Sequence, residues 1–79
     1  MYLLFSEDMK KEVRKYIKGG TIRGLVIFRT ETGEAVKVVS NISECHSYMI
    51  SHNVYDENVY ASILVNLVDC LDGRIQIWK

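Results

Sequence analysis

The hydrophobic repeat of this 79-residue chain changes at Gly19-Gly20, from helical spacing before the glycine pair to strand-type residues after it. One helical face precedes the pair, formed by Met9, Val13, Tyr16 and Ile17. Ser6 stands before this run as an N-cap residue, and two acidic residues follow it in the first turn, where the helix dipole favours negative charge. Because a glycine pair is a helix stop signal, we expect a helix that begins after Ser6 and ends at Lys18.

Strand-type segments surround this helix. Residues 2–5 predict a short strand, and the β-branched and aromatic residues of segment 21–29 predict a longer one. The glycine-containing turn at 31–34 joins that segment to its hairpin partner at 35–39. A last strand is expected over residues 74–78.

The middle of the chain predicts a second helix and an ambiguous segment. Asn41 and Glu44 have the spacing of a capping box, so a helix is expected from there to about His52. We assign four apolar residues to one face of this helix: Ile42, Cys45, Met49 and Ile50. In segment 56–71 a helical spacing and a strand alternation compete, and we favour the helix with the strand as the alternative.

The predicted element order is therefore β-α-β-β-α-(α or β)-β. Such a chain is expected to form a single α+β domain over residues 1–79. The natural arrangement has two layers, a small and mainly antiparallel sheet with two or three helices on one face. Residues 25–28 are apolar at four successive positions, so we expect both faces of that strand to be covered at least in part.

Charge and hydropathy exclude several classes of protein. Ten Lys and Arg balance ten Asp and Glu, which argues against a nucleic-acid module that acts through bulk positive charge. No apolar stretch approaches the ~20 residues that cross a bilayer, and we expect a cytoplasmic protein with reduced thiols and no membrane contact. A chain of this length buries only ~60–65% of its unfolded surface, so we expect a homodimer to supply additional stability.

The few soft ligands do not have the spacing of a metal site. Cys45 and His46 are adjacent, and Cys45 and His52 are two helical turns apart, whereas zinc sites pair their ligands closely. Cys45 and Cys70 are expected to be small core residues. We therefore expect no metal, no cofactor and no catalytic residue, and hence a protein that is not an enzyme.

Two surfaces are candidates for binding. Four basic residues share one side of the first predicted helix, namely Lys11, Arg14, Lys15 and Lys18. A solvated helix face is the commonest source of such a basic patch. An acidic protein partner and nucleic acid are the alternatives, although the patch lacks interleaved aromatic residues for base stacking. Residues typical of recognition surfaces gather elsewhere, and we assign partner binding to Tyr48, Met49, His52, Tyr55 and Trp78.

The hypothesis that best fits these patterns is a small non-enzymatic protein-binding domain, inhibitor-like or adaptor-like, that docks to a protein partner and associates with itself. The alternative is a nucleic-acid-binding protein that uses the basic face of the first helix.

Overall fold

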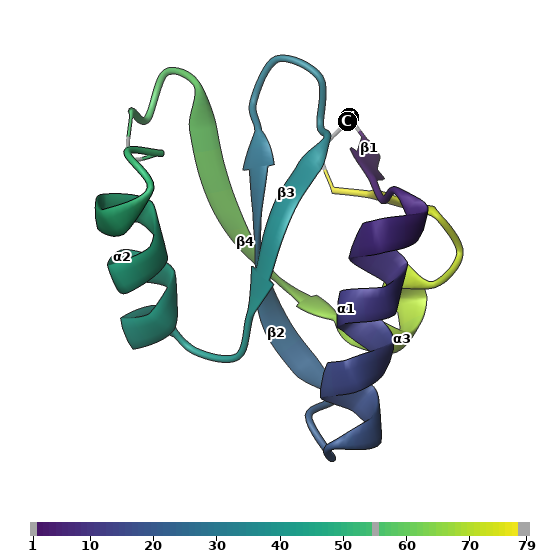
Figure 1. Ribbon diagram of the computed structural model, residues 1–79. Coiled ribbons are helices and arrows are strands. Elements are labelled where there is room, and N and C mark those ends of the chain that lie inside the picture. Colours follow the sequence, from purple (N-terminus) through teal and green to yellow (C-terminus); the bar gives the residue numbers. More distant parts are fainter. Residues whose placement is uncertain (1, 55, 78–79) are drawn as a thin grey trace.

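A computed structural model describes residues 2–54 and 56–77, and it places the larger of two small sheets between the two longer helices (Figure 1). The elements follow one another as β1 (Tyr2–Leu4), α1 (Glu7–Lys18), β2 (Arg23–Arg29), β3 (Ala35–Val39), α2 (Ile42–Ser51), β4 (Tyr60–Asn66), α3 (Leu67–Cys70) and β5 (Arg74–Gln76). The predicted α+β class and element order are confirmed. The last strand ends at Gln76, and the predicted contact residue Trp78 lies outside the described residues.

The larger sheet has three strands in the order β3-β2-β4, all antiparallel. β2 pairs with β4 without irregularity, from Arg23 opposite Asn66 to Arg29 opposite Tyr60. β1 and β5 form a separate antiparallel pair. The Leu4 N–H donates to the Gly33 carbonyl oxygen at 2.9 Å, and this bond ties the small sheet to the β2–β3 turn.

The segment that follows α2 is a strand and not the favoured helix. Residues 60–66 form β4, so the helical interpretation is wrong there, and only Leu67–Cys70 make a single helical turn. The local sequence fits both a helical period and a strand alternation. The strand forms because this segment pairs with all seven residues of β2. Tertiary hydrogen bonding therefore overrides a pattern that local spacing left open.

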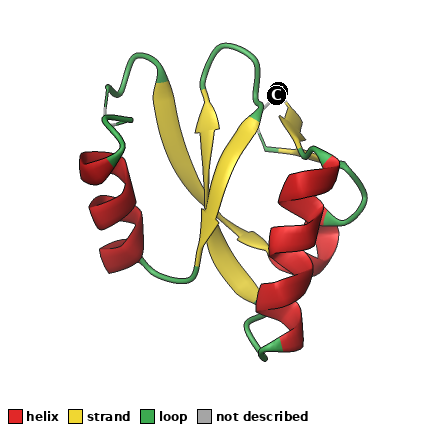
Figure 2. Cartoon of the chain, in the orientation of Figure 1, coloured by secondary structure: helices red, strands yellow, loops and turns green. Residues whose placement is uncertain are grey.

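The two long helices lie on opposite faces of the three-stranded sheet, as the helices on either side of the strands show (Figure 2). Val26 and Phe28 point into a core cluster that contains Val13 of α1. Ile27, the residue between them, points into a second cluster with Cys45 of α2. The predicted placement of all helices on one face is thus wrong, because four successive apolar residues of β2 require cover on both sides.

The helix caps follow the sequence signals closely. Ser6 Oγ accepts the Met9 N–H at 3.2 Å, and Asn41 Oδ1 accepts the Glu44 N–H at 2.8 Å. The Glu44 carboxylate reaches back to the N–H and hydroxyl of Ser40, at 3.1 and 3.0 Å, one residue earlier than in a capping box. The bonds to Ser6 and Asn41 satisfy amides that the first turn of a helix leaves without partners.

Candidate functional site

Helix α2 covers only part of its face of the three-stranded sheet. The second core cluster joins Cys45 of α2 to Ile27 and Val39, with half-buried Tyr48 and Met49 packed against them. That cluster contains residues of β2 and β3 but none of β4. The face of β4 that is turned toward α2 therefore stays open to solvent.

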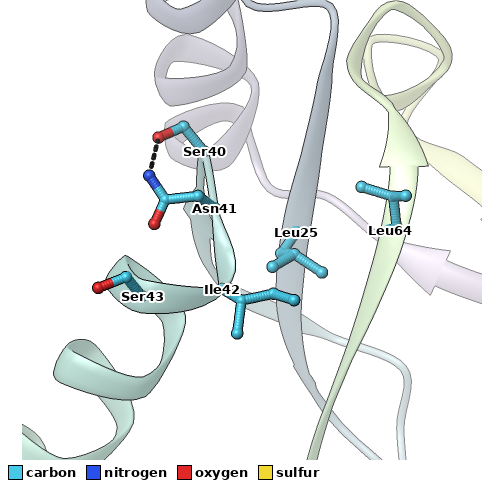
Figure 3. Close-up of a pocket in the computed structure, with 6 residues that line it drawn as sticks. All are labelled: Leu25, Ser40, Asn41, Ile42, Ser43 and Leu64. Atoms are coloured by element: carbon cyan, nitrogen blue, oxygen red, sulfur yellow. Dashed lines mark hydrogen bonds between the residues drawn. The ribbon is translucent and has the colours of Figure 1, made fainter.

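An apolar groove of about 630 Å³ occupies this uncovered region. It is lined by Leu25, Ser40, Asn41, Ile42, Ser43 and Leu64. The close-up shows Leu25 between Ile42, at the start of α2, and Leu64, on β4 (Figure 3). Ile42 is 68% exposed and Leu64 is 53% exposed, so the apolar walls of the groove are accessible. Two serines and an asparagine form its polar rim.

The first turn of α2 explains why Ile42 lies here. Ile42 follows the Asn41 cap and belongs to the same helical stripe as Cys45 and Met49. Cys45 and Met49 pack against the sheet, whereas Ile42 lies over the groove. Ile50 is 67% exposed, so of the four residues predicted on one helical face only Cys45 and Met49 pack against the sheet.

The outer edge of β4 carries backbone groups that no described strand pairs. Bonds from the Thr30 N–H to the Val59 oxygen (2.9 Å) and from the Leu67 N–H to the Ile22 oxygen (2.8 Å) flank the ladder with β2. In an antiparallel pair alternate residues bond to the partner, so the odd-numbered residues 59–67 face β2. The N–H and C=O groups of Ser62 and Leu64 consequently point away from β2.

This edge lacks the devices that usually protect an edge strand. Tyr60–Asn66 contains no charged residue and no proline, and its register with β2 shows no bulge. Edges of soluble proteins are normally blocked by such features because unpaired strands attract other strands. The edge is therefore open to an added strand directly beside the groove.

The residues assigned to partner binding are placed differently from one another. Tyr48 and Met49 are half-buried against the sheet, and His52 is exposed. The rings of Tyr48 and His52 stack with centroids 4.1 Å apart, while the Lys37 ammonium lies 5.7 Å from the Tyr48 centroid. The stacking brings two of the predicted residues, Tyr48 and His52, together at the end of α2. Tyr55 lies outside the described residues.

The basic patch forms the outer side of α1. All four of its residues are exposed: Lys11, Arg14, Lys15 and Lys18. Within the described part of the chain a single ion pair is found, between Lys10 and Glu7 at 3.2 Å. The four charges of the patch are therefore not neutralised by neighbouring carboxylates.

Both cysteines are buried free thiols, in agreement with their prediction as core residues. Cys45 is 3% exposed and Cys70 is fully buried, and they belong to the clusters on opposite faces of the sheet. Burial, helped by the negative charge of Asp69, raises the pKa of the Cys70 thiol to about 12. Cys70 is therefore protonated at neutral pH and is a poor nucleophile. No three His, Cys, Asp or Glu side chains converge on a metal position across residues 2–54 and 56–77.

None of the six groove residues was predicted as a site residue from the sequence, and the apolar ones among them are Leu25, Ile42 and Leu64. Their apolar character is visible in the sequence, but their exposure depends on how far α2 extends over the sheet.

No helix in the described ranges is long and apolar enough to cross a bilayer. No protein-family model, curated protein or solved structure matches this chain.

Proposed function

We propose that this chain is a non-enzymatic protein-binding domain that docks an extended segment of a partner, a second copy of itself included, along β4 and the adjoining groove. One observation carries the proposal: the backbone groups of Ser62 and Leu64 point outward on an unprotected edge beside exposed apolar side chains. A strand added at this edge would satisfy those groups, which is the basis of peptide recognition by strand addition.

The site defines the chemistry of the segment that it fits. Outward N–H and C=O groups require an extended backbone in the partner. The groove, with Leu25, Ile42 and Leu64 as its walls, requires an apolar side chain next to that backbone. None of the six lining residues is charged, so an uncharged segment fits better than an acidic or basic one.

Two features support a role without catalysis. None of the six described residues that line the groove is an Asp, Glu, His, Cys or Lys, the side chains that most often transfer a proton. The thiols of Cys45 and Cys70 are buried in separate clusters, and neither is among the residues that line the groove. A cytoplasmic location belongs to the same proposal, because free thiols persist where the environment is reducing.

Substituting Leu64→Lys is expected to abolish self-association. The lysine places a charge at the open edge, a device by which natural edge strands prevent pairing. Size-exclusion chromatography with light scattering should give the wild type twice the 9.1 kDa mass of one chain, and the variant the mass of one chain.

The matched control is Ile50→Lys, which adds the same charge at a position that is 67% exposed on α2 and outside the groove. This control should keep the mass of the wild type. A wild type that remains a single chain at millimolar concentration would contradict self-association. A dimer that both variants leave intact would contradict the proposed docking surface.

A second candidate function is nucleic-acid binding through the basic patch, which its four exposed and unpaired cations favour. We assume that each of the four cations contacts one phosphate of duplex DNA. A plot of the logarithm of the binding constant against the logarithm of the salt concentration should then have a slope of roughly −3.6. Fluorescence anisotropy of a labelled duplex measures this slope. Arg14→Glu should weaken binding strongly, whereas Arg29→Glu, an equal charge change in β2, should not. Equal effects of the two substitutions would rule out the α1 surface.

A further inference from the structure

The alternation of inward and outward backbone groups along β4 indicates a specific mode of self-association. This inference rests on the proposed function above. We infer that β4 pairs with β4 of a second copy, antiparallel and centred on Ile63. The two three-stranded sheets then become one continuous six-stranded sheet. In this register Ser62 lies opposite the partner's Leu64, and Tyr60 lies opposite the partner's Asn66.

Centring on Ile63 follows from the hydrogen-bonding pattern and the length of the strand. Only residues whose backbone groups point outward can bond to an added strand, and in β4 these have even numbers. Ile63 is the middle residue of Tyr60–Asn66, so this register is the one that uses the whole of β4 in both copies. In this register every residue with outward backbone groups in one β4 lies opposite such a residue in the other.

The side chains of β4 suit pairing with an identical strand. The small Ser62 meets the large Leu64 of the partner on the groove face, and Ala61 meets the partner's Val65 on the other face. No like charges are brought together, because the strand carries none. The zero net charge of the chain also avoids long-range repulsion between copies.

This pairing also covers the exposed wall of the groove. Leu64 of each copy lies diagonally across from the partner's Leu64, a separation over which long side chains make contact. The two grooves then meet along β4, with Leu25 and Ile42 on the outer side of each Leu64. An apolar centre with a rim of serine and asparagine has the anatomy of a protein interface. A second copy is therefore the occupant that satisfies both the backbone edge and the groove.

Hydrogen exchange of the full chain tests whether the backbone of β4 is paired. The amides of Ser62 and Leu64 point outward and should exchange roughly tenfold or more slowly at millimolar than at low micromolar concentration, because dimers accumulate there. The amides of Ile63 and Val65 face β2 and should be protected at both concentrations. A dimer in which the Ser62 and Leu64 amides remain unprotected would overturn strand pairing and leave the docking surface in place. A chain that stays monomeric at millimolar concentration would overturn self-pairing through β4.

Disulfide trapping tests the register. Residues in a hydrogen-bonded antiparallel pair have Cα atoms about 5.5 Å apart, which a disulfide can span. A mixture of the Ser62→Cys and Leu64→Cys variants should give a cross-linked heterodimer under mild oxidation. Ser62→Cys mixed with Ile50→Cys is the control and should not. The native thiols are buried and need not be replaced. Cross-linking of Ser62→Cys with itself in equal yield would overturn the Ile63-centred register.

Discussion

Replacing Gly33 by alanine is expected to lower the free energy of unfolding by roughly 3 kcal/mol or more. Gly33 has a φ of 79°, a left-handed conformation that side chains disfavour. A Cβ at this position would also overlap the backbone carbonyl oxygen of Tyr2. The cost is large because that carbonyl cannot move freely: β1 is held to the turn by the bond from the Leu4 N–H to the Gly33 oxygen.

Gly20→Ala separates the two parts of this cost. Gly20 has a φ of 93°, but no atom lies within 4 Å of the position that a Cβ would occupy. This variant should therefore lose only the conformational part, roughly 1–2 kcal/mol. Urea unfolding followed by circular dichroism, at one protein concentration for all variants, measures both losses. Equal losses would show that the turn and β1 are not in close contact.

Truncating Phe28 to alanine should cost roughly 3–5 kcal/mol, the range for removing a buried aromatic ring. Phe28 is fully buried in the cluster between the sheet and α1. Its neighbours across both flanking strands are alanines, Ala35 on β3 and Ala61 on β4. The ring fills the space above these small side chains, so its removal leaves a cavity that they cannot fill.

The matched comparison for Phe28→Ala is Ile50→Ala on the exposed surface of α2. Ile50 is 67% exposed, and its truncation should change the free energy of unfolding by less than about 0.5 kcal/mol. Phe28→Leu should fall between the two, because most of the buried volume is kept. The same urea unfolding experiment measures all three. A loss below about 1 kcal/mol for Phe28→Ala would mean that the ring is not packed as the structure describes.

The parts of the fold that were predicted correctly depend on local signals. Helix α1 begins after Ser6 and ends at Lys18, because a cap, an apolar face and a glycine stop all lie within the same segment. β3 occupies the predicted 35–39, since the glycine turn and β-branched residues specify a hairpin locally. Asn41 caps α2 for the same reason.

The candidate site could not be predicted in the same way. Leu25 and Leu64 are ordinary strand residues in the sequence, and they line a groove only because α2 meets β2 and β3 and leaves β4 uncovered. Tyr48 and Met49 were assigned to partner binding from their composition. In the structure both are half-buried in the second core cluster. Residue type alone does not distinguish a side chain that packs at the edge of the core from one that binds a partner.

Local chemistry in the sequence determined the α+β class, the first helix, the hairpin and the burial of Cys45 and Cys70. Tertiary structure alone decided that residues 60–66 form an edge strand and that the two long helices take opposite faces. The physical reason is that caps, turns and hydrophobic periods act over a few residues. Strand pairing and the choice of face depend on which distant surfaces remain to be covered, and at β4 one edge remains open in the described chain.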